Sequence, residues 1–172
     1  MRVAVGTRVV YPVHGVASVV GREHRTIAGE PTDYVVLRIA NGDGVHDLTL
    51  RVPVAQLEEL GVRNAISADE AVEVLAVLAV EDSRVPSNWS RRFKNHQEKL
   101  RSGDVFACAE VVRNLERRQM VKPLAPAENA MLRRARRGLV SELAVSWGVD
   151  DDVASGRVDL ALQRSNPAGR GE

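Results

Sequence analysis

The spacing of apolar residues changes near residue 67, and this change constrains the fold more than any other feature of the chain. Before it, short runs rich in β-branched residues alternate with clusters of glycine, proline and asparagine, a pattern typical of strands joined by turns. After it, apolar residues recur every three or four positions, as on one face of a helix. Because strands and helices do not alternate, the sequence predicts an α+β chain with two domains of different class.

Four or five short strands are expected in the first part of the chain. The clearest cover residues 8–11, 16–20, 34–39 and 48–52, and turn residues fill 12–15, 28–31 and 41–44. Pro53 follows the last of these strands, where proline is tolerated mainly at the edge of a sheet. This pattern predicts a small β-barrel or strongly bent sheet over residues 1–62.

Residues 63–165 are predicted to form an all-α helical bundle. The expected helices cover residues 67–80, 88–101, 104–120 and 127–147, with a short fifth helix at 153–162. Ser67 and Glu70 have the spacing of a capping box, in which each side chain binds the other residue's backbone amide. Pro126 suits a first helical position. Residues 166–172 are expected to be a disordered tail.

Basic side chains are concentrated in one block of the helical part. The formal charge of the whole chain is only +1, but residues 91–137 hold 13 basic and 5 acidic side chains, a net charge of +8. Salt screens exposed charges beyond about 8–10 Å, so a local basic surface attracts phosphates whatever the total charge is. The distribution is therefore compatible with a nucleic-acid partner.

Motifs for catalysis are missing from the sequence. The four histidines are scattered, and the sequence has neither a glycine-rich phosphate loop nor a nucleophile elbow. Cys108 falls on the apolar face of its predicted helix, where a structural thiol is expected. The acidic run at 150–152 suits a helix start better than a metal site. We expect no catalytic residues, metal, cofactor or membrane span, and a reducing, cytoplasmic environment.

Trp89 has two interpretations from the pattern alone. The side chains at positions 93, 96 and 100 share its helix face, which favours a place in the core. It also stands in the first turn, where a side chain can project beyond the end of a bundle. A planar apolar group flanked by cations is what a minor-groove wedge needs, because the cations bind the neighbouring phosphates. The flanking cations are Arg91, Arg92 and Lys94.

A second basic cluster falls on the predicted helix at 127–147. Its arginines spread over the side opposite the leucines, with no acidic residue between them. Such a cluster is either a solubilising face or a surface that contacts DNA phosphates, and the pattern leaves both open. The cluster consists of Arg133, Arg134, Arg136 and Arg137. As DNA-contacting residues we predict Arg133, Arg134 and Arg137.

Several blocks of the sequence, in order, resemble the CarD family of bacterial RNA polymerase-binding transcription regulators. The main blocks are Val9–Gly15, Arg25–Gly29, Leu48–Pro53 and Pro86–Lys94, and further similarity runs to about residue 147. Two departures are visible: the segment 41–47 is longer than the family's usual connection, and Ala125 stands where a capping serine is typical.

The resemblance implies a Tudor-like fold for residues 1–62. In the family this domain docks on the RNA polymerase β subunit through an edge strand, with Arg25, Ile27 and Arg51 at the matching interface positions. Exposed arginines can form paired hydrogen bonds with carboxylates, and the isoleucine would supply an apolar anchor. Without the resemblance, Ile27 could equally be an ordinary barrel residue.

For residues 63–165 the resemblance implies binding to promoter DNA at the upstream edge of the transcription bubble. Trp89 would wedge there, with phosphate contacts from the cations that follow it. The expected function is that of a non-enzymatic, monomeric regulator that stabilises the open promoter complex with little sequence specificity. Through RNA polymerase the regulator would be associated with the nucleoid. The alternative is an adaptor that binds polymerase or another protein partner without engaging DNA.

Overall fold

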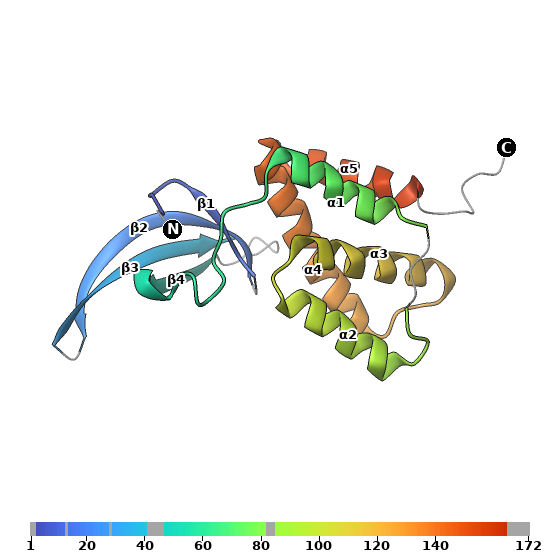
Figure 1. The fold of residues 1–172 in the computed structure, drawn as a ribbon, viewed down its shortest axis with the longest axis horizontal. Helices are drawn as coiled ribbons and strands as arrows, with labels where there is room; N and C mark the ends of the chain where they lie inside the picture. Colours follow the sequence, from blue (N-terminus) through green and yellow to red (C-terminus); the bar gives the residue numbers. More distant parts are fainter. Residues whose placement is uncertain (1–2, 13, 28, 41–46, 82–84, 165–172) are drawn as a thin grey trace. The chain divides into compact units, whose positions relative to one another are not determined.

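A computed structural model describes residues 3–12, 14–27, 29–40, 47–81 and 85–164. The chain divides into two compact units, residues 1–65 and 66–172 (Figure 1). Each unit has its own hydrophobic core. The division falls after the expected boundary at residue 62 because the backbone of Arg63 bridges to Val10 of the first strand. Strands build the first unit and helices the second, which confirms the predicted fold class.

The first unit is a curled antiparallel sheet of four strands among the described residues. The strands are β1 (Arg8–Tyr11), β2 (Gly15–Ile27), β3 (Glu30–Ile39) and β4 (Leu48–Pro53). They pair in sequence order, so β4 is an edge strand, as Pro53 predicted; the proline is the last residue of the strand. A bulge between Val19 and Gly21 interrupts the register of β2 against β3, and bulges of this kind bend a sheet.

The β2–β3 hairpin is longer than the sequence predicted. Its distal half pairs Arg22 with Val35 and continues to Ile27 opposite Glu30, whereas β4 begins to pair with β3 only at Tyr34. The result is a two-stranded arm that extends beyond the other strands (Figure 1). Its side chains are mostly exposed on both faces, so the sequence lacks the apolar alternation of a half-buried strand.

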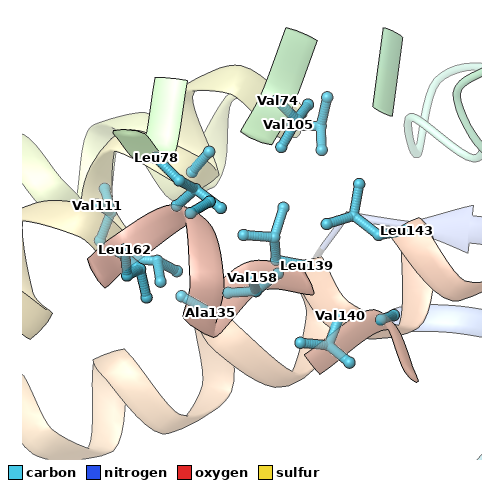
Figure 2. Close-up of a cluster of buried hydrophobic side chains, with 14 of the residues drawn as sticks. Val74, Leu78, Val105, Val111, Ala135, Leu139, Val140, Leu143, Val158 and Leu162 are labelled. Carbon is cyan, nitrogen blue, oxygen red and sulfur yellow. The ribbon is translucent and has the colours of Figure 1, made fainter. Parts of the chain in front are cut away.

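The second unit is a bundle of five helices within the described part of the chain. They are α1 (Ala68–Ala79), α2 (Trp89–Arg101), α3 (Val105–Val121), α4 (Pro126–Trp147) and α5 (Asp151–Arg164). Each of the five predicted helices is present, and the capping box forms, with Glu70 N donating to Ser67 Oγ at 3.2 Å and Ser67 N donating to Glu70 Oε2 at 2.8 Å. Leu78, Leu139 and Leu143 lie at the centre of the core (Figure 2).

Cys108 packs against this core as a half-buried thiol and donates a hydrogen bond to the carbonyl oxygen of Ala135, at 3.6 Å. Asp151 and Asp152 lie in the first turn of α5, where negative charge complements the helix dipole. The long connection at 41–46 and the tail at 166–172 lie outside the described residues. None of the described helices is long and apolar enough to cross a membrane.

Candidate functional site

Three charged side chains meet on the face of the sheet opposite its core. Arg25 donates to Glu23 Oε2 from Nε at 2.9 Å, and its Nη2 lies 2.6 Å from the same oxygen. Arg51 donates from Nε to both carboxylate oxygens of Glu23, each at 3.1 Å. The register explains the meeting: Arg51 is opposite Val36, which is opposite Gly21, so Glu23 lies diagonally across β3 from Arg51.

The two arginines leave part of their guanidinium groups available to a partner. Hydrogen bonding from Arg51, and then from Arg25, holds the pKa of Glu23 below its usual value against the opposing effect of burial, so the group is a carboxylate at neutral pH. Glu23 binds Arg51 only through Nε. The side chains of Arg25 and Arg51 remain 51% and 46% exposed. Both therefore face solvent in an orientation fixed by one shared carboxylate.

Ile27 extends the same face toward the end of the arm. It lies two residues beyond Arg25 in β2, and alternate residues of a strand point to one side. Its side chain is 52% exposed, so it is a surface residue and not part of the sheet's core. The structure thus places Arg25, Ile27 and Arg51 on one face. Sequence reasoning missed Glu23, although its two-residue spacing from Arg25 was a usable signal.

Trp89 is the first residue of α2 and lies at the boundary between core and solvent. Asn88 caps the helix, accepting a hydrogen bond from the amide of Arg91 at 3.1 Å. One face of the indole stacks on Phe93, with ring centroids 5.2 Å apart and planes at 16°. The residue is nevertheless 45% exposed, so it is not sealed within the bundle. Arg91 and Lys94, on the same two turns, are exposed cations.

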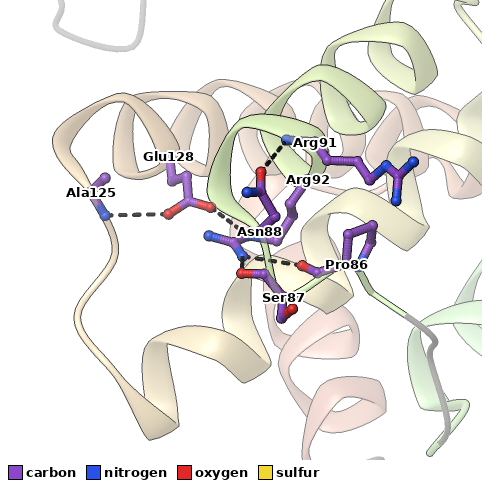
Figure 3. A network of polar contacts seen from close by, with 7 residues as sticks. All are labelled: Pro86, Ser87, Asn88, Arg91, Arg92, Ala125 and Glu128. Atoms are coloured by element: carbon purple, nitrogen blue, oxygen red, sulfur yellow. Dashed lines mark hydrogen bonds and ion pairs between the residues drawn. The ribbon is translucent and has the colours of Figure 1, made fainter.

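Arg92 does not have the place that the sequence assigned to it. Its side chain is 1% exposed, and Nε donates to Glu128 Oε1 at 2.8 Å (Figure 3). Nη1 donates to the carbonyl oxygens of Pro86 at 3.2 Å and Ser87 at 3.0 Å. A guanidinium enclosed by these acceptors cannot reach a DNA phosphate, so the predicted phosphate contact is wrong. Arg92 instead shares the buried face of α2 with His96, four residues later.

Glu128 is the buried partner of Arg92 and belongs to the first turn of α4. Burial pushes the pKa of Glu128 upward, but the hydrogen bonds from Arg92 and from the Ala125 backbone outweigh it and hold the pKa below its ordinary value. Its second oxygen, Oε2, accepts from the Ala125 amide at 3.4 Å. Ala125 supplies no capping side chain, and Glu128 instead binds its backbone amide, while Asn129 Nδ2 donates to the carbonyl oxygen of Leu124 at 3.1 Å. No sequence signal linked Glu128 to an arginine 36 residues earlier.

His96 lies beside this ion pair as a neutral imidazole. It is 2% exposed, and its Nδ1 has no hydrogen-bond partner among the described residues. Burial, together with repulsion from Lys99 and Arg92 and against the opposing attraction of Glu128, lowers the pKa of His96 from 6.5 to about 4. Protonation would add a positive charge beside Arg92 and Lys99, whose own charges Glu128 and Glu110 already bind.

We expect the helical unit to lose stability as the pH falls from 6.5 to about 4. In this window His96 is protonated in the unfolded chain but neutral in the folded one, so the unfolded state binds more protons and acid favours unfolding. Urea melts followed by helical circular dichroism should show a flatter pH dependence for His96→Gln than for the wild type. The exposed His24, replaced in the same way, is the control. Equal slopes for wild type and His96→Gln would contradict the assignment.

The arginines of α4 form a surface separate from the Arg92–Glu128 contact. Arg133, Arg134 and Arg137 are exposed, as predicted. At 3.6 residues per turn they lie roughly 120–180° around the helix axis from Glu128, so they face away from α2. Arg136 differs, because its guanidinium binds Glu116 and Asp159. The wedge candidate on α2 and the basic face of α4 are therefore two distinct surfaces of one bundle.

Comparisons with known proteins match both units. The family model described as the C-terminal domain of CarD matches residues 73–159, and the one described as the CarD-like/TRCF RID domain matches residues 3–66. A curated relative is the Bacillus subtilis (strain 168) protein named "Putative transcription factor YdeB". It is 26% identical over 147 residues, which cover 86% of this chain and 94% of that protein.

Proposed function

The chain belongs to the CarD family, and from this premise we propose that it is a non-enzymatic regulator that holds the RNA polymerase β subunit and stabilises melted promoter DNA. The sheet would contact the polymerase and the helical bundle the DNA. The regulator would act as a monomer in the cytoplasm, at the nucleoid. The half-exposed indole at the start of α2 carries the DNA part of the proposal.

Docking on the polymerase is supported by the edge position of β4. The strand has no neighbour on its outer side among the described residues, so its backbone can pair with a strand of a partner. Beside this edge, Arg51 and Arg25 offer guanidinium nitrogens, which suit paired carboxylate contacts. Ile27 offers an exposed apolar side chain on the same face. The three residues together fit an acidic partner surface with an apolar pocket.

Stabilisation of melted DNA is supported by the position of the Trp89 side chain at the start of α2. A ring with one face backed by Phe93 and much of its surface open can fill the gap at a disturbed base step. Arg91 and Lys94 follow within two turns and can bind the phosphates that flank such a step. Contacts of this kind carry little base information, so the proposed binding has little sequence specificity.

The salt dependence of promoter binding tests whether the basic face of α4 contacts DNA. The logarithm of the affinity falls by about 0.9 per decade of salt for each phosphate neutralised on duplex DNA. If Arg133, Arg134 and Arg137 each bind one phosphate, replacing all three by glutamine lowers this slope by about 2.7. Fluorescence anisotropy of a labelled upstream-fork duplex at several salt concentrations measures it.

The matched control for this experiment is Arg164→Gln, which removes an exposed positive charge from the end of α5. We expect its slope to equal that of the wild type. A triple variant with an unchanged slope would show that the α4 arginines only solubilise the bundle. A wild-type protein with no measurable affinity for the fork would favour the adaptor, which binds protein partners without DNA.

A further inference from the structure

Within the described parts of the chain, no hydrogen bond fixes the direction of the Trp89 indole. Among the described residues its only recorded partner is Phe93, which lies on the same helix one turn later. Stacking within one helix sets the ring relative to α2 but not relative to the rest of the bundle. The direction in which Trp89 projects therefore depends on what fixes the first turns of α2.

Arg92 is the side chain that fixes them. It lies one turn after Trp89 and reaches back to the carbonyl oxygens of Pro86 and Ser87, the two residues before the helix cap (Figure 3). The same guanidinium binds Glu128 of α4. One buried side chain thus joins the approach to α2, the first turns of α2 and a second helix.

Glu128 extends this connection to the backbone of α4. One of its oxygens binds Arg92, and the other accepts from the amide of Ala125, the residue that precedes the helix. The starts of α2 and α4 are therefore held against each other by a pair of side chains that are 1% and 2% exposed. Burying two charges costs desolvation that their attraction often only offsets, so a fixed geometry is a better account of this pair than added stability.

We propose that Arg92 and Glu128 are positioning residues for Trp89: the buried pair sets the direction in which the indole projects toward DNA. This inference rests on the proposed function, because it takes Trp89 as the group that touches the DNA. It assigns Arg92 a role through another residue and not through a phosphate.

The first test is the lifetime of the open promoter complex with Arg92→Lys and Glu128→Gln. Lysine keeps the charge but loses the planar fork that reaches two carbonyls and a carboxylate at once. We expect about a threefold to tenfold shorter lifetime for each variant at equal polymerase occupancy. Arg136→Lys is the matched control. The guanidinium of Arg136 also binds two carboxylates at once, but the residue lies on α4 away from Trp89.

A double-mutant cycle separates positioning from general weakening of the bundle. If Arg92 acts through Trp89, Arg92→Lys adds no further shortening once Trp89 is alanine. An additive effect would show that Arg92 acts by another route and would overturn the inference. Should Arg92→Lys fail to fold, Glu128→Gln, which keeps the size of the side chain, carries the same cycle.

A spectroscopic readout completes the test without polymerase or DNA. With Trp147→Phe as the background, Trp89 is the only tryptophan of the sequence. Its fluorescence anisotropy then reports the mobility of the indole, and quenching by acrylamide reports its exposure to solvent. We expect Arg92→Lys to lower the anisotropy and raise the quenching, while Arg136→Lys changes neither. If Arg92→Lys and Glu128→Gln left the lifetime unchanged while Trp89→Ala shortened it, this inference would be overturned but the proposed function would stand. An unchanged lifetime in Trp89→Ala would overturn the proposed function itself.

Discussion

Replacing Trp89 with alanine shortens the lifetime of the open promoter complex by about one to three orders of magnitude, if the indole fills the gap at the edge of the melted DNA. The substitution removes the half-exposed indole, and the ring of Phe93 loses the group that stacks on it. The exposed cations Arg91 and Lys94 remain, so binding to duplex DNA should change much less than the lifetime does. Competitor challenge of preformed complexes, at saturating regulator, measures the lifetime directly.

Two variants control for this result. Trp147→Phe alters the other tryptophan, which lies under the guanidinium of Arg157 at 4.6 Å, and it should leave the lifetime unchanged. Trp89→Phe keeps a planar apolar ring of smaller area and should give an intermediate lifetime. A lifetime unaffected by Trp89→Ala, measured at equal polymerase occupancy, contradicts the wedge.

Reversing the charge at Arg51 should have the second large effect, this time on polymerase capture. Arg51→Glu removes a guanidinium from the proposed interface and places a new carboxylate beside Glu23. In the wild type both carboxylate oxygens of Glu23 accept a hydrogen bond from Arg51 Nε. Like charges juxtaposed in an interface cost several kcal/mol, so we expect affinity to fall on the order of a hundredfold or more. Pull-down and titration with purified polymerase measure the loss.

Arg22→Glu is the matched control for this experiment. Arg22 is an exposed arginine of β2, but it lies on the opposite side of the strand from Glu23. Its charge reversal changes the net charge of the sheet by the same amount without altering the face that carries Arg51. Equal capture by the two variants would show that total charge matters and that the proposed docking face is misplaced.

The arrangement of elements was predictable because local patterns determine it. The switch from strand to helix spacing, the capping box at Ser67 and the proline that ends β4 each act within a few residues, and each is present in the structure. The distal arm of β2 and β3 was not predictable in this way. Its strands are held by pairing with each other and not by an apolar face, so residues such as Arg22 and His24 resemble a loop in the sequence.

The candidate site was predictable only where exposure follows helix or strand periodicity. Exposed Arg133 and Arg137 follow from the buried leucines opposite them. Arg92 was misassigned because it adjoins Arg91 in sequence, although neighbouring residues of a helix differ by about 100° in direction. Its partner Glu128 is 36 residues away, and Glu23 lies 28 residues from Arg51. Pairings at that range depend on the tertiary fold, which no local pattern encodes.

The edge position of β4 also bears on aggregation. An uncovered sheet edge can serve as a template for identical molecules, and the other edge of this sheet is partly closed by the bridge between Val10 and Arg63. Two β4 strands aligned antiparallel near their centres would bring two Arg51 guanidiniums together, and Pro53 has no amide hydrogen to donate. The composition of this edge therefore discourages fibre-like growth of the protein on itself while leaving the strand open to a chain of opposite charge.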